Sequence, residues 1–91
     1  MMKLLNFGQA IEAAKQGLKV ARTGWNGSGM FAYIVPTEEC EKYEVEKKHF
    51  KEESKFIVRQ HWRLKTVQED VASWSPSGSD SLAEDWIILD K

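Results

Sequence analysis

Residues 6–22 read NFGQAIEAAKQGLKVAR and hold a complete helix signal followed by the start of a sheet. Asn6 is a good N-cap, and Gln9 stands three residues later, where its side chain can return a capping-box hydrogen bond. Gly17 can take the left-handed conformation that closes a helix. Apolar side chains with the spacing of one helical face lie between these ends, namely Phe7, Ala10, Ile11 and Ala14. The pattern predicts a helix over residues 7–16.

A β-hairpin is predicted directly after this helix. Residues 18–22 alternate apolar and polar side chains, as a half-buried strand does. Residues 23–29 contain three glycines and an Asn-Gly pair, which are typical of a turn with positive φ angles. Residues 30–35 form a β-rich run that Pro36 ends, so we expect them to pair with the first strand.

The rest of the sequence predicts further strands. Residues 38–55 carry many Glu and Lys residues and predict a short strand followed by a solvated charged loop. Residues 56–64 alternate between an apolar and a cationic face, which predicts a long strand. The remaining predicted elements are a strand at 71–74, a hydroxyl-rich loop at 75–81, a helical turn at 81–84 and a closing strand at 86–89. We therefore expect an α+β fold in a single domain over residues 1–91, with one N-terminal helix packed on an antiparallel sheet of about five strands.

Composition limits the class of protein. A chain of 91 residues has room for one core, and a monomer of this size is marginally stable, so self-association is one route to stability. The chain has 13 Lys and Arg residues and 14 Asp and Glu residues, so its net charge is close to zero. This balance disfavours a protein that binds long nucleic acid, although it is compatible with a local basic patch. No apolar run approaches the roughly 20 residues of a membrane-spanning helix. The single cysteine, Cys40, predicts a reduced thiol, so we expect a cytoplasmic protein.

The sequence offers little for catalysis. His49 and His61 lack the spacing of metal ligands, and Cys40 has no evident base beside it. The hydroxyl-rich loop lacks a nucleophile-elbow pattern. Carboxylates near a loop–helix junction usually cap backbone N–H groups, which applies to Asp80, Glu84 and Asp85. We therefore predict a protein that is not an enzyme and uses no metal or cofactor.

The glycine-rich turn is a candidate binding site. Trp25 lies in it beside Asn26 and Gly27, and Arg22 comes just before it. An indole in a turn can stack on a base, and a guanidinium can pair with a phosphate. Glycines let backbone N–H groups approach an anion closely. These four residues are therefore a candidate nucleotide pocket, the alternative being a structural turn in which Trp25 covers a small core.

The hydroxyl-rich loop and the tryptophan before it form a second and weaker group of candidates. Hydroxyls beside an indole can contact a ribose or a phosphate. The residues of this group are Trp74, Ser75, Ser77 and Asp80.

Trp62 and Trp86 lie on predicted strands with apolar neighbours, and we expect both in the core. For the cationic strand face, a solvated surface and a ligand contact both remain open; its residues are Arg59, His61 and Arg63.

Several motifs in this order resemble the second-type Thoeris anti-defence proteins of phages. The opening block is FGQAIEAAKQG at residues 7–17, and residues 20–27 give VARxGWNG. Residues 61–66 match an H-x-x-x-K-T pattern, and Trp74 matches the tryptophan that follows it. Residues 80–86, DSLAEDW, are similar to the closing D-x-L-A-x-D-W of the family. The resemblance covers almost the whole chain.

The resemblance implies a sponge and not an enzyme. Proteins of this family bind cyclic nucleotide immune signals, in particular cyclic ADP-ribose isomers made by Thoeris TIR proteins, and some take cyclic dinucleotides. They hold the signal without cleaving it, and they are similar in forming homotetramers with ligand pockets between protomers. The resemblance thus implies a phage-type protein of the host cytoplasm. This chain departs from the family at residues 47–53, which are charged, and at residues 67–70, where the family often has a glycine.

Three other functions fit the residues alone. A small interaction module would dock a phage or host protein through an exposed apolar patch. A binder of single-stranded nucleic acid would use the face of Arg59, His61 and Arg63 together with aromatic residues. A hydrolase of the same signal would differ from a sponge by releasing cleaved ligand.

Overall fold

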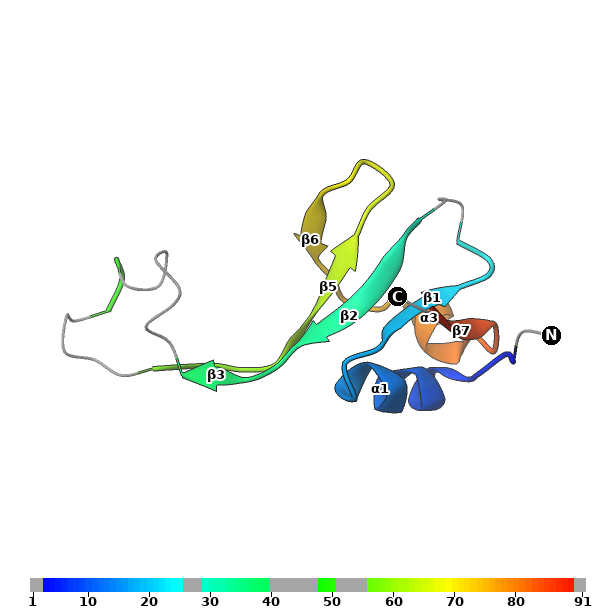
Figure 1. Cartoon of the computed structure of the whole chain (residues 1–91), viewed down its shortest axis with the longest axis horizontal. Helices are drawn as coiled ribbons and strands as arrows, with labels where there is room; N and C mark the ends of the chain where they lie inside the picture. The colour runs from blue at the N-terminus through cyan, green and yellow to red at the C-terminus, as the bar shows by residue number, and fades with distance from the viewer. Residues whose placement is uncertain (1–2, 26–28, 40–47, 51–55, 90–91) are drawn as a thin grey trace.

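The computed structural model describes residues 3–25, 29–39, 48–50 and 56–89 and confirms the α+β fold. Its elements in chain order (Figure 1) are α1 Phe7–Lys15, β1 Lys19–Arg22, β2 Phe31–Val35, β3 Glu38–Glu39, β4 Ile57–Val58, β5 His61–Lys65, β6 Val71–Ser73, α3 Gly78–Leu82 and β7 Trp86–Leu89. The predicted N-terminal helix, hairpin and closing strand are confirmed, with ends that agree to about one residue.

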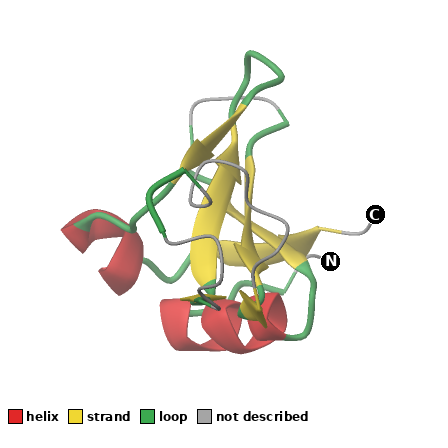
Figure 2. Ribbon diagram, turned by 90° about the vertical axis from the view of Figure 1, so that its left-hand side faces the viewer, coloured by secondary structure: helices red, strands yellow, loops and turns green. Residues whose placement is uncertain are grey.

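Five strands form one antiparallel sheet in the order β6-β5-β2-β1-β7, so β2 is the central strand. The first hairpin places Val20 directly opposite Ala32, and both side chains are fully buried. Helix α1 packs against β1, β2 and β7 on this face. Figure 2 shows α1 below the sheet and α3 to one side of it. The core is therefore a single layer of side chains between α1 and one face of the sheet.

The predicted strand at residues 56–64 is divided in the structure into β4 and β5. Strand β5 pairs with β2, and β4 pairs with β3 in a continuation of the same register. Pro36 lies between β2 and β3 and has no N–H to donate to the ladder. Opposite this break, Gln60 donates its backbone N–H to Thr37 Oγ1 at 2.8 Å. One long hairpin is thus interrupted by its proline. Strand β3 lies at the start of residues 38–55, whereas Tyr43 and Val45, whose alternation predicted a short strand there, lie outside the described residues.

Helix α1 begins and ends as predicted. Asn6 Oδ1 accepts the Gln9 N–H at 2.8 Å, and Gln9 Oε1 accepts the Asn6 N–H at 2.9 Å. Gly17 has a φ of 91°, the left-handed conformation that closes the helix. The predicted apolar stripe is only partly buried, because Phe7 and Ile11 are half-buried. The buried side of α1 consists of Ala10, Ala13 and Ala14, whose small side chains let the helix approach the sheet closely.

Helix α3 begins earlier than the helical turn predicted at residues 81–84, and those predicted bounds are wrong. Ser77 Oγ accepts the Asp80 N–H at 3.0 Å, and Asp80 Oδ2 accepts the Ser77 N–H at 3.1 Å. This reciprocal cap places the first helical residue at Gly78. The loop of turn-forming residues therefore contains the helix start.

The turn between β5 and β6 holds a strained residue. Glu69 has a φ of 62°, a left-handed conformation that costs a residue with a Cβ roughly 1–2 kcal/mol. Its ion pair with Lys65 involves a side chain that is 80% exposed, and such pairs contribute little. We expect Glu69→Gly to raise the free energy of unfolding by about 0.5 kcal/mol, because relief of strain outweighs the lost ion pair and the greater freedom of the unfolded chain.

Thermal unfolding followed by circular dichroism measures this effect. Glu69→Ala is the matched control, since alanine loses the ion pair and keeps the strain. Equal melting temperatures for the glycine and alanine variants would contradict the prediction.

Candidate functional site

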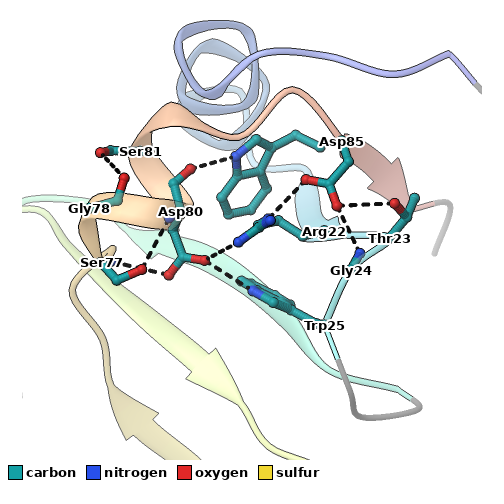
Figure 3. Close-up of polar contacts among 10 residues, drawn as sticks. Arg22, Thr23, Gly24, Trp25, Ser77, Gly78, Asp80, Ser81 and Asp85 are labelled. Atoms are coloured by element: carbon teal, nitrogen blue, oxygen red, sulfur yellow. Dashed lines mark hydrogen bonds and ion pairs between the residues drawn. The ribbon is translucent and has the colours of Figure 1, made fainter.

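The structure brings the two groups of candidate residues together (Figure 3). Arg22 ends β1 and Trp25 follows it, whereas Asp80 belongs to α3, 58 residues after Arg22. Arg22 Nη1 donates to Asp80 Oδ1 at 2.9 Å, and Trp25 Nε1 donates to the same oxygen at 3.2 Å. Candidates that the sequence suggested separately thus form one site. Two further candidates lie outside the described residues, namely Asn26 and Gly27.

Arg22 is held between two carboxylates. Its Nε donates to Asp85 Oδ1 at 2.8 Å, in addition to the hydrogen bond from Nη1 to Asp80. These hydrogen bonds to Asp85 and Asp80 raise the pKa of Arg22 above its usual value. We call Arg22, Asp80 and Asp85 the Arg22 clamp. With two carboxylates around one guanidinium, the clamp carries net negative charge and does not present a free cation to a phosphate.

Asp85 stabilises the turn that follows β1 through two hydrogen bonds. Its Oδ2 accepts the Gly24 N–H at 2.8 Å and the Thr23 hydroxyl at 3.1 Å. The hydrogen bond from Arg22 lowers the pKa of Asp85, burial opposes this, and the bonds from Gly24 and Thr23 add to the lowering. A Cβ on Gly24 would lie 3.0 Å from Asp85 Oδ2, so a side chain at position 24 would disturb this contact.

Asp80 connects the clamp to α3 and to the core. Burial raises the pKa of its carboxyl, but hydrogen bonds from Arg22, Ser77 and Trp25 outweigh this and leave the pKa below its ordinary value. Its backbone C=O accepts the Trp86 Nε1–H at 3.0 Å. Ser77 and Asp80 therefore have a clear structural role as the reciprocal cap of α3.

The aromatic side chains of the site form one cluster. Trp25 packs edge-to-face on Trp74 at 5.9 Å between ring centroids and on Trp86 at 5.3 Å. Trp74 packs in the same way on Trp62 at 5.2 Å. Trp86 is fully buried, as predicted, whereas Trp25, Trp62 and Trp74 are half-buried against the core. Three indoles thus combine a packing role with a partly exposed surface.

Ser75 and the cationic strand residues lie outside the Arg22 clamp. Ser75 is exposed in the segment between β6 and α3, and its hydroxyl has no hydrogen-bond partner among the described residues. His61 and Arg63 belong to β5, on the sheet face opposite α1. Arg59 is exposed between β4 and β5.

The prediction that Asp85 caps a backbone N–H group is confirmed by its contact with Gly24, whereas its ion pair with Arg22 was not predicted. The usable signal is the cation at the end of β1, since a half-buried Arg22 requires carboxylate partners. The acidic pair near the closing strand supplies them. Residue type thus indicates that Arg22 needs acidic partners, but it does not identify which carboxylates these are.

A groove of about 470 Å³ lies elsewhere, between α1 and β7, with Leu5, Leu18 and Ile88 in its lining. None of the candidate site residues lines this groove.

Within the described ranges, no group of three or more His, Cys, Asp or Glu side chains is placed to hold a metal ion. Neither of the two described helices is long and apolar enough to cross a membrane.

The model of the Thoeris anti-defense 2-like domain, Tad2-like, matches residues 5–89. The chain belongs to this family. It is also 34% identical over 92 residues to the protein "Thoeris anti-defense 2" of Bacillus phage SP01, a match that covers 98% of this chain and 99% of that protein. The family resemblance of the sequence motifs is thus confirmed. The Arg22 clamp and the tryptophan cluster fall entirely within the part that matches the Tad2-like model.

Because of the two carboxylates of the Arg22 clamp, we expect the stability of this Tad2-like fold to fall at acidic pH. The pKa values of Asp80 and Asp85 lie below the ordinary 3.8 in the folded state. Their contribution to stability is therefore present above about pH 4 and is lost as the pH falls through the lowered values, because the unfolded chain then binds more protons. We expect constant stability from pH 7 to about pH 5 and a steep decline below pH 4, measured by urea unfolding.

The double variant Asp80→Asn, Asp85→Asn is the control for this pH dependence. It lacks both titrating groups, so its stability at pH 7 is lower and its decline between pH 5 and pH 3 is shallower. A double variant that declines as steeply as the unaltered protein would show that other carboxylates cause the acid sensitivity.

Proposed function

We propose that this Tad2-like protein counters Thoeris defence in the host cytoplasm by binding and sequestering a cyclic nucleotide signal without cleaving it. The expected ligands are cyclic ADP-ribose isomers and cyclic dinucleotides. The observation that carries the proposal is the Trp25–Trp74 pair, two half-buried indoles next to the Arg22 clamp in a chain of the Thoeris anti-defence family.

The indole pair supplies stacking surface for a base. Stacking of one base on an aromatic side chain contributes roughly 1–3 kcal/mol. The Trp25 ring is fixed from two sides, by its hydrogen bond to Asp80 and by its edge-to-face contact with Trp86. A ring held in one orientation loses little conformational entropy on binding, which favours affinity.

The polar groups of the site divide into two proposed roles. The guanidinium of Arg22 is already paired through two of its nitrogens, so we assign it to holding Trp25 and α3 in place. We assign the ribose and phosphates to the Ser75 hydroxyl, which has no hydrogen-bond partner among the described residues, and to Asn26 and Gly27, which follow Trp25 in the sequence and lie outside the described residues. Ser77 acts through the cap of α3.

A second copy of the chain is proposed to complete the pocket, in a homotetramer. Capture of a signal near micromolar concentration requires about −8 kcal/mol, which demands an enclosed site. The described groove of the single chain contains none of the candidate residues, and the indoles expose only part of their surfaces. Oligomerisation would enclose them and would add stability to a small domain.

Calorimetry with a panel of cyclic ADP-ribose isomers and cyclic dinucleotides tests the proposal. We expect at least one ligand to bind with a dissociation constant of about 1 µM or lower. Denaturing the mixture after incubation should return that ligand intact, whereas cleaved product would show a hydrolase. Sedimentation equilibrium should give a mass four times that of one chain. Failure of every ligand to bind would overturn the proposal and favour an interaction module.

A further inference from the structure

The sheet has a second face, which no described helix covers. Val20 and Ala32 are buried under α1, and successive side chains of a strand point to opposite faces. Phe31 and Tyr33 of the central strand β2 therefore lie on the opposite face, which we call the open face. Helix α3 also lies on the α1 side, since it contacts Arg22, which is paired with the buried Trp86.

Cationic side chains flank the two aromatic rings of the open face. Phe31 pairs with Lys65 and Tyr33 pairs with Arg63 across β2 and β5, so all four share this face. On the other side, Lys19 Nζ of β1 lies 4.9 Å from the centroid of the Phe31 ring. Aromatic rings on a central strand are thus bordered by positive charge on both neighbouring strands.

The charges of the open face are only partly neutralised, since Lys65 is paired with Glu69. Lys65 donates to Glu69 Oε1 at 2.9 Å and to the Gly29 carbonyl at 3.1 Å, which fixes its ammonium 5.9 Å from the Phe31 centroid. Among the described residues, Lys19 and Arg63 have no carboxylate partner. The chain carries a net charge of −1, so this positive surface is a local segregation of charge.

We propose that the open face binds a short single-stranded nucleic acid, with bases stacked on Phe31 and Tyr33 and phosphates beside Lys19 and Arg63. The two ring centroids are 6.0 Å apart with planes inclined at 48°, so they offer separate faces to neighbouring bases. Sheet surfaces with aromatic rings on central strands typically stack two or three bases of a single strand. The surface is distinct from the Trp25 site, which lies on the α1 side of the sheet.

Fluorescence anisotropy with labelled oligouridine and oligothymidine of about eight nucleotides tests this second binding activity. Contact with two or three phosphates should weaken binding about 7-fold to 18-fold when the salt rises from 50 to 200 mM. We expect Tyr33→Ala and Arg63→Gln each to reduce affinity at least about 5-fold. Tyr33→Phe keeps the ring and should retain most of the binding.

Two control variants separate this surface from the other properties of the protein. Lys15→Gln removes a charge from the exposed end of α1, and Trp25→Phe alters the proposed signal site; both should bind oligonucleotide as the unaltered protein does. The proposal is overturned by absence of binding at about 100 µM protein or by binding that salt does not change. It is also overturned if Tyr33→Ala and Arg63→Gln change the sedimentation mass instead, because the open face is then an interface between copies.

Discussion

Replacing Arg22 with methionine is expected to lower the free energy of unfolding by about 3 kcal/mol. Methionine preserves much of the packing volume but leaves Asp80 and Asp85 without their shared cation. The Asp80 and Asp85 side chains are only 13% and 25% exposed, so water replaces the guanidinium incompletely. For a domain of this size the loss corresponds to a fall in melting temperature of about 12–24 °C.

A double-mutant cycle isolates the clamp from other effects of the substitution. Arg22→Met combined with Asp85→Asn should cost less than the sum of the two single changes, since each single change leaves a charge unpaired. Arg63→Met is the matched control, because Arg63 has no carboxylate partner in the described part of the chain, and its effect should stay within about 0.5 kcal/mol. Equal losses for Arg22→Met and Arg63→Met would mean that the clamp does not stabilise the fold.

Trp25→Ala is expected to abolish binding of the cyclic nucleotide signal, with a loss of at least about 100-fold in affinity. The substitution removes the proposed stacking surface and also the hydrogen bond to Asp80. Because the ring packs on Trp74 and Trp86, the same change should destabilise the fold by about 2–3 kcal/mol. Calorimetry and thermal unfolding of one preparation measure both effects.

Trp25→Phe separates binding from folding. Phenylalanine keeps an aromatic ring in the cluster but loses the Nε1 donor to Asp80, and we expect a loss of about 10-fold in affinity with a small change in stability. Trp62→Phe alters an indole of the same cluster that does not contact the Arg22 clamp, so affinity should be retained. Equal losses of affinity in the two phenylalanine variants would place Trp25 among the structural residues.

Local patterns in the sequence were sufficient for most of the fold. The capping box of Asn6 and Gln9 and the closing Gly17 depend on contacts between near neighbours, and both are confirmed. Strand β1 forms as predicted, but its burial does not alternate, because Val20 and Ala21 are both buried. Two errors have physical causes. The strand at residues 56–64 is interrupted because its partner contains Pro36, and α3 starts early because the cap at Ser77 determines its first turn.

The site was predictable in composition and not in connectivity. Arg22, Trp25 and Asp80 were selected as candidates from residue type alone, and the structure places them in contact. Arg22 forms internal ion pairs with Asp80 and Asp85, and its pairing with a ligand phosphate stays a prediction. The partner carboxylates lie 58 and 63 residues further along the chain, a separation at which no local pattern reports contact.

Strand β7 has a consequence for biosynthesis. Trp86 is fully buried, and its backbone exchanges hydrogen bonds with Leu5, which lies near the opposite end of the described chain. Helix α1 and the first hairpin are synthesised well before residues 86–89. The apolar side chains that pack against β7 therefore stay exposed in the nascent chain until β7 has been synthesised. Folding of the domain therefore has to wait for the synthesis of β7, and premature stop codons upstream of Trp86 should yield products that proteases remove instead of shortened active proteins.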